Sequence, residues 1–143
     1  MNQRVLIEKN YLRIPIRKDA IEKNVWLYQE LTAVLQFQAG LFVDYGSGAP
    51  DFYAELPVER WKGSVLTFVH EEDRPVPFLQ SDELLPNTEP FQPWIHFAPK
   101  SGWMNDVCGA CWYQGSYHLY FQHNPFGVQW NNMSWGHAVS SDL

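Results

Sequence analysis

Aromatic and amide side chains surround two isolated carboxylates in the last third of the chain. From Ser101 to Leu143 the only formally charged residues are Asp106 and Asp142, and Asp106 ends the tetrapeptide Trp103-Met104-Asn105-Asp106. The indoles and side-chain amides around it include Trp103, Trp112, Trp130, Trp135, Asn105, Gln122, Asn124, Asn131 and Asn132. Sugars offer apolar ring faces that stack on indoles, and hydroxyls that pair with amides and carboxylates. The pattern therefore predicts a carbohydrate site in which Asp106 can be a catalytic group.

A simpler interpretation of Asp106 stands beside this one. An Asp that follows Asn in a loop commonly forms an Asx turn or caps a strand. The tetrapeptide alone leaves both interpretations open.

The sequence Cys108-Gly109-Ala110-Cys111 has the C-x-x-C spacing of some zinc and redox sites. Zinc needs two further ligands, and nothing in the spacing selects them from the histidines at positions 96, 118, 123 and 137. A redox site needs a βαβ context, which the sequence does not show. We expect two small side chains in a strand, with no metal and no cofactor. We likewise expect His137 to be a hydrogen-bonded structural residue.

Composition restricts the class of protein. The chain has 143 residues, of which 45% are hydrophobic and 16% aromatic, and its net charge is -6. These values are typical of a globular, β-rich protein and offer no basic surface for nucleic acid. No apolar run reaches the ~18 residues of a membrane span, and no apolar segment follows Met1-Asn2-Gln3-Arg4 as in a signal peptide. We expect neither a nucleic-acid nor a membrane partner.

Short strands separated by turn residues fill the first part of the chain. Tyr11 to Ile16 alternates between Tyr11, Arg13 and Pro15 on one face and apolar residues on the other, which predicts a half-buried strand. Further strands are predicted at 25–28, 35–37, 41–45, 52–56 and 64–70. Residues 1–70 are therefore expected to form a small β-sandwich-like domain.

The amino-acid composition changes after residue 70. Residues 71–93 hold five prolines and few periodic apolar residues, which predicts a linker between domains or an ordered loop that wraps around them. Strands follow at 109–113, 117–122 and 133–140, the first two joined by the turn Gln114-Gly115-Ser116. This order is that of a β-meander, the repeating element of a propeller blade.

Four segments in this second part resemble the opening of the catalytic domain of glycoside hydrolase family 32, the fructan hydrolases and invertases. They are His96-Phe97-Ala98-Pro99, Gly102-Trp103-Met104-Asn105-Asp106, Tyr117 to Pro125, and Met133 to Ser140, with Trp130 between the last two. The first ~90 residues resemble the small β domain that precedes the propeller in some levanase-like members, notably at Pro50-Asp51-Phe52-Tyr53 and Trp61-Lys62-Gly63.

The resemblance implies an all-β fold in which residues 94–143 begin a five-bladed propeller that is incomplete in this chain. It implies hydrolysis of β-fructofuranosyl bonds in fructans or sucrose with retention, with Asp106 as the nucleophile. Asn105, Gln122 and Trp130 then match positions that line the fructose pocket. The family also suggests an exported protein.

Two departures from the family affect this expectation. Val107 and Cys108 stand where the family has proline and asparagine, which removes a fixed φ and a side-chain amide beside Asp106. The acid/base Glu of the family comes from later blades, beyond Leu143, so we expect this chain alone to be inactive. A non-catalytic carbohydrate-binding or interaction module is the alternative function.

Overall fold

The computed structural model describes residues 1–44, 46, 48–85 and 96–142. The chain divides into two compact units, Met1–Thr88 and Glu89–Leu143. Residues 86–93 of the expected linker lie outside the described residues, as do Tyr45 and the first two residues of the expected blade. The division into residues 1–70, 71–93 and 94–143 remains a prediction.

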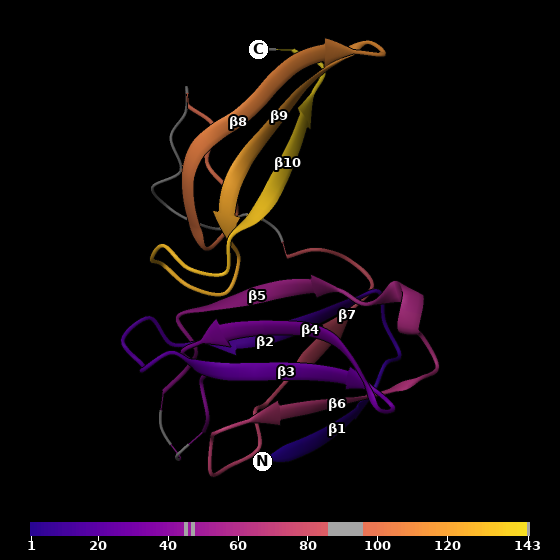
Figure 1. Ribbon diagram of the computed structural model, residues 1–143, viewed down its shortest axis with the longest axis vertical. Coiled ribbons are helices and arrows are strands. Elements are labelled where there is room, and N and C mark those ends of the chain that lie inside the picture. Colours follow the sequence, from indigo (N-terminus) through magenta and orange to yellow (C-terminus); the bar gives the residue numbers. More distant parts are fainter. Residues whose placement is uncertain (45, 47, 86–95, 143) are drawn as a thin grey trace. The chain divides into compact units, whose positions relative to one another are not determined.

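The described residues form an all-β protein, as the sequence predicts (Figure 1). Their only helical element is a 3-10 turn, η1 (Glu59–Trp61). The strands are β1 (Asn2–Leu6), β2 (Tyr11–Ile16), β3 (Lys23–Gln29), β4 (Thr32–Ala39), β5 (Phe52–Pro57), β6 (Val65–His70), β7 (Leu79–Ser81), β8 (Trp103–Tyr113), β9 (Ser116–Asn124) and β10 (Ser134–Ser140). A sandwich for the first part and a propeller blade for the second remain predictions.

The first unit contains two antiparallel sheets, with strand orders β1-β6-β3-β4 and β5-β2-β7. Strand β2 spans the predicted residues, and its alternating apolar side chains Leu12, Ile14 and Ile16 are at most 2% exposed. Apolar side chains from β3, β4, β5 and β6 are also buried. Burial of one face of each sheet is the main source of stability in such a fold.

One strand of this unit was wrongly predicted, at residues 41–45, and two strands, β1 and β7, were missed. Residues 41–45 were expected to form a strand, but Leu41 makes only an isolated bridge to Ile16, and Phe42 N donates to the carbonyl of Pro15 at 2.9 Å. The chain here packs across the end of β2 instead of adding to a sheet. Strand β1 was missed because its sequence, Asn-Gln-Arg-Val-Leu, begins with three polar residues at a sheet edge.

The second unit is a three-stranded antiparallel sheet in the order β10-β9-β8. Strands β8 and β9 are joined by Gln114 and Gly115, whose φ angles are 48° and 82°. Two successive positive φ angles are those of a type I′ hairpin turn, and they explain the glycine. The predicted turn is confirmed, and β9 becomes the central strand of the sheet.

His70 is a buried titratable residue at the end of β6. Its side chain is 2% exposed, and neither ring nitrogen has a hydrogen-bond partner among the described residues. Burial, aided by the N-terminal ammonium group and opposed by Glu72, lowers the pKa of His70 below its ordinary value. The folded unit therefore favours the neutral imidazole.

This burial predicts a pH-dependent stability. Because the pKa of His70 is lower in the folded than in the unfolded chain, the unfolded chain binds more protons as the pH falls through about 6.5. The free energy of unfolding should be highest above that pH and should fall between pH 8 and pH 5.5. Urea titrations of the wild type and of His70→Leu measure this. A decline of equal size in both proteins would contradict the assignment to His70.

Candidate functional site

Asn105 and Asp106 lie on strand β8, at a bulge. Met104 pairs with His123 and Val107 pairs with Phe121, so Asn105 and Asp106 together face the single residue Gln122 of β9. Bulges of this kind bend a strand and redirect its side chains, and they occur frequently beside active sites. The expectation that Asp106 follows Asn105 in a loop is wrong: both residues belong to β8.

The bulge brings three of the four predicted site residues to one place. Asn105 Nδ2 donates to Gln122 Oε1 at 3.3 Å, and this amide pair lies beside Asp106 in the pairing pattern. The Asp106 side chain is exposed, as is that of Asn105. A carboxylate next to two amides offers both acceptors and donors to the hydroxyls of a sugar.

A second irregularity in the pairing of β8 with β9 follows directly after the first. Val107 pairs with Phe121 and Gly109 pairs with Tyr120, so Cys108 has no partner residue on β9. The Cys108 Sγ lies 3.8 Å from the Asp106 carbonyl oxygen, and Val107 is 55% exposed. The two residues that replace the family's proline and asparagine therefore occupy the bulged segment itself. Figure 1 shows β8 bending along its length.

Trp130, the fourth predicted residue, lies in the loop between β9 and β10, where it is 68% exposed. That loop is held by Asn124, whose side chain is fully buried. Asn124 Nδ2 donates to the Gln129 carbonyl at 2.9 Å, and Asn124 Oδ1 accepts from the Phe126 N–H and from Asn132 Nδ2, each at 3.0 Å. Sequence reasoning did not assign this role, although Asn before Pro is a recognised signal for a side-chain-supported turn.

Gly102 fixes where β8 begins. Its φ is 81°, and a Cβ atom there would lie 2.2 Å from the Asn124 carbonyl oxygen. Only glycine permits this approach without a shift of the backbone. His123 Nε2 lies 2.9 Å from the carbonyl of Ser101, which adds a second link between the end of β9 and the start of β8.

A row of rings continues from the amide pair across the sheet. The ring centroids of Trp135 and Tyr120 are 6.3 Å apart, and Tyr120 stacks on His137 at 4.4 Å and 3°. His137 Nε2 lies 2.9 Å from His118 Nδ1, and His118 Nε2 lies 3.3 Å from the Tyr113 carbonyl. Because a carbonyl only accepts, we assign the proton of His118 to Nε2, and His137 Nε2–H then donates to His118 Nδ1. His137 thus has the hydrogen-bonded structural role that was expected.

Asp142, the other carboxylate among the described residues of this unit, is far from Asp106. Asp142 follows Ser140, which pairs with Tyr117, whereas Asp106 lies opposite Gln122. Five residues of strand separate Gln122 from Tyr117, which is about 17 Å. Asp142 also exchanges hydrogen bonds with Ser140. The pair does not have the ~5 Å spacing that a retaining glycosidase requires.

The described residues hold neither a metal site nor a membrane-spanning helix. Within them, no group of three or more His, Cys, Asp and Glu side chains is placed to hold a metal ion. None of their helices is long and apolar enough to cross a membrane. Cys108 and Cys111 are free and exposed.

Residues of the second unit are similar to known protein sequences. Residues 96–143 match the model described as the glycosyl hydrolases family 32 N-terminal domain. The levanase of Bacillus subtilis (strain 168) is 53% identical over 55 residues, which are 38% of this chain and 8% of that protein. The extracellular exo-inulinase of Aspergillus awamori is 51% identical over 55 residues, 38% of this chain and 10% of that protein.

A third relative, the sucrose-6-phosphate hydrolase of Escherichia coli, is 47% identical over 53 residues, 37% of this chain and 11% of that protein. The chain thus matches about a tenth of the length of these curated relatives. Among solved structures, a glycoside hydrolase family 32 protein from Bifidobacterium adolescentis aligns with 99% of this chain and 26% of its own, at 24% identity and a TM-score of 0.39. That score is too low to support an argument about the fold.

The Asn124 side chain gives a testable prediction. Asn124→Ala leaves the Phe126 N–H and the Gln129 carbonyl without their partner, so we expect it to lower the free energy of unfolding by about 3 kcal/mol. Asn105→Ala removes one exposed amide contact and should cost less than about 1 kcal/mol. Chemical denaturation followed by tryptophan fluorescence compares them. Equal costs for the two variants would show that Asn124 does not hold the loop.

Proposed function

We propose that the chain is the N-terminal part of a retaining β-fructofuranosidase of glycoside hydrolase family 32 that acts on fructans or sucrose, because residues 96–143 match the model of that family and resemble the relatives described above. Asp106 is its nucleophile, and Asn105, Gln122 and Trp130 line the fructose pocket. The observation that carries the proposal is the bulge in β8, which sets Asn105 and Asp106 together against Gln122.

The proposed chemistry requires a charged carboxylate at this position. A carboxylate oxygen of Asp106 attacks the anomeric carbon of the fructosyl unit, and the bond from that carbon to the leaving oxygen breaks. A carboxylic acid protonates the leaving oxygen and then, as the carboxylate, removes a proton from the water that releases fructose. The amides of Asn105 and Gln122 hold hydroxyls of the fructosyl ring, and the exposed indole of Trp130 provides an apolar wall.

We place the acid/base group in a part of the longer enzyme that this chain does not contain. Asp142 is the only other carboxylate side chain after residue 100, and it lies too far along the sheet. Two exposed apolar surfaces of the second unit support the proposal that further blades pack against it. Trp112 and Trp135 are 57% and 73% exposed, and a hollow of about 550 Å³ is lined by residues that include Phe97, Leu119 and Ala138. Exposed apolar surface of this kind is normally covered.

The alternative function is a non-catalytic carbohydrate-binding module. The first unit favours it, because Met1–Thr88 has sheets and a buried core of its own. In that case the second unit is a remnant of the enzyme family. Activity and binding measurements separate the two functions.

The first prediction concerns the chain by itself. Because the described residues of the second unit place no other carboxylate near Asp106, the purified chain should release no fructose from levan, inulin or sucrose above the uncatalysed background. Anion-exchange chromatography of the products measures the release. Fructose that is formed by the wild-type chain and lost in Asp106→Asn would overturn our placement of the acid/base group outside this chain.

A chimera tests the role of Asp106. Residues 94–143 replace the matching segment of the Bacillus subtilis levanase, so that the remaining part of that enzyme completes the site. We expect the chimera to hydrolyse levan and expect Asp106→Asn to lower kcat on the order of 10⁴-fold, as loss of a catalytic nucleophile does.

Asp142→Asn is the matched control, because it removes the same charge from the same sheet and should leave kcat within a factor of about two. Azide should restore cleavage in Asp106→Ala and yield a fructosyl azide of inverted configuration, since it replaces the missing nucleophile. An Asp106→Asn chimera with full activity would refute the proposed role.

A further inference from the structure

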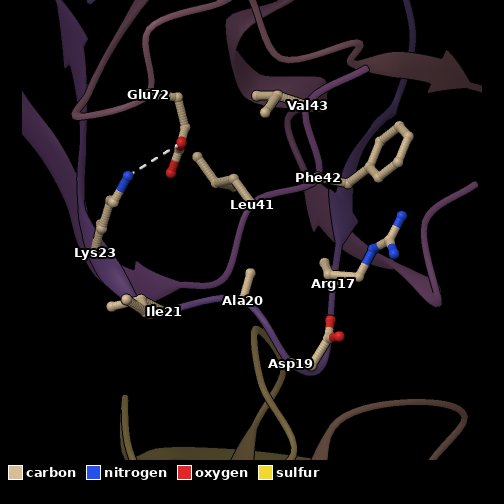
Figure 2. Close-up of a pocket in the computed structure, with 9 residues that line it drawn as sticks. All are labelled: Arg17, Asp19, Ala20, Ile21, Lys23, Leu41, Phe42, Val43 and Glu72. Carbon is tan, nitrogen blue, oxygen red and sulfur yellow. Dashed lines mark hydrogen bonds and ion pairs between the residues drawn. The ribbon is translucent and has the colours of Figure 1, made fainter. Parts of the chain in front are cut away.

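A hollow of about 470 Å³ opens on the surface of the first unit (Figure 2). It is formed entirely by residues of Met1–Thr88 and shares none with the candidate site. Its lining residues are Arg17, Asp19, Ala20, Ile21, Lys23, Leu41, Phe42, Val43 and Glu72. Its volume lies within the usual range of small-molecule sites, which is about 300–1,000 Å³.

The floor of this hollow is apolar and fixed. Leu41, Phe42 and Val43 are 4%, 6% and 8% exposed. The bridge between Ile16 and Leu41 and the hydrogen bond from Phe42 N to the Pro15 carbonyl tie the floor to the end of β2. A floor attached to a buried strand keeps its shape without a ligand.

One wall is equally well fixed. Residues 17–20 form a turn in which Ala20 N donates to the Arg17 carbonyl at 3.2 Å, and Arg17 N donates to the Gly40 carbonyl at 2.8 Å. A Cβ atom on Gly40 would lie 2.7 Å from the Arg17 carbonyl oxygen and 2.8 Å from that of Ala20. The turn therefore packs directly on Gly40. A site that is formed in advance avoids the entropic cost of ordering its walls on binding.

Polar groups stand on two sides of the apolar floor. Figure 2 shows Lys23 and Glu72 meeting on one side of Leu41, with Arg17 and Phe42 on the other. Lys23 Nζ lies 3.1 Å from Glu72 Oε2, and the Glu72 side chain is only 11% exposed. Arg17 Nη2 donates to the Ala49 carbonyl at 3.1 Å, and its guanidinium lies 5.2 Å from the centre of the Phe42 ring.

The lining charges cancel. Arg17 and Lys23 carry positive charge, while Asp19 and Glu72 carry negative charge. A phosphate or another anion would meet two carboxylates, and an organic cation would meet an ammonium and a guanidinium. The combination of paired donors and acceptors above an apolar floor suits a ligand that is neutral, rich in hydroxyl groups and apolar on one ring face.

We propose that this hollow binds one or two units of a neutral saccharide chain, with Lys23 and Glu72 hydrogen-bonded to ring hydroxyls and Leu41 under the ring. The choice of a fructan as the first ligand rests on the function proposed above. The site itself does not, because no residue of the second unit takes part in it.

Binding to the full chain tests the proposal. Titration calorimetry and saturation-transfer NMR are run with short levan and inulin oligosaccharides, and with maltohexaose as a glucan. We expect the wild type to bind a fructo-oligosaccharide with a Kd of about 1 mM, because the site is open and offers few hydrogen bonds. Glu72→Gln and Lys23→Met should each weaken binding about tenfold.

The matched control is Asp82→Asn. Asp82 forms exposed ion pairs with Lys9 at 2.6 Å and with Lys62 at 3.3 Å in the same unit, away from the hollow, so binding should be unchanged. Thermal unfolding of every variant confirms that the unit is folded.

Glucan binding that is lost in Glu72→Gln and in Lys23→Met would support the saccharide site and change only the preferred sugar. No binding of any saccharide by the wild type would overturn the proposal, as would binding that survives in both folded variants. Neither result depends on whether the chimera hydrolyses levan, so the two proposals fail independently.

Discussion

The buried side chain of Asn124 is the constraint on which the C-terminal unit depends. Its amide groups hold the backbone of the loop that carries Trp130. The backbone carbonyl oxygen of the same residue lies so close to Gly102 that no side chain fits there, and Gly102 leads directly into the strand that carries Asp106. The candidate site residues are therefore positioned by backbone contacts at the ends of their segments more than by contacts with one another. A single buried polar group can do this because each of its hydrogen bonds is costly to lose.

The sequence predicted those elements in which polar and apolar residues alternate, and those turns that contain glycine. Strand β2 and the turn at Gln114 and Gly115 were found because alternation and glycine report directly on backbone geometry. The chemistry of Asp106 was inferred from its neighbours, but its place on a strand was not, since a bulge breaks the alternation that identifies strands. The central role of Asn124 was also missed, because the sequence does not show which polar side chain becomes buried. The hollow of the first unit could not be foreseen, as it joins residues that are up to 55 positions apart.

If the chain has the proposed function, the neighbouring sheet that covers β8, β9 and β10 also supplies the second catalytic carboxyl group. Asp106 is exposed in this chain, and a hydrated carboxylate gains little from nearby dipoles. A neighbouring sheet that buries the exposed indoles would also exclude water from the carboxylate and bring the acid group. Preorganised dipoles stabilise a transition state most effectively in such a closed site. The departure at Val107 and Cys108 then matters less than it does in the isolated sheet, because neighbouring residues can restrain the bulged segment.

The two irregularities of β8 have a consequence for how its length can change. Each adds one residue to β8 relative to β9, and the two together add an even number. Met104, Val107 and Ala110 pair with His123, Phe121 and Leu119, which are alternate residues of β9, so all three project from the same face of the sheet although three positions separate each from the next. Loss of one residue between Asn105 and Cys108 would therefore remove one bulge and leave the pairing of the flanking residues with β9 unchanged. The segment can shorten by one residue without inverting the rest of β8, but loss of the first bulge would separate Asn105 and Asp106 from their shared position opposite Gln122.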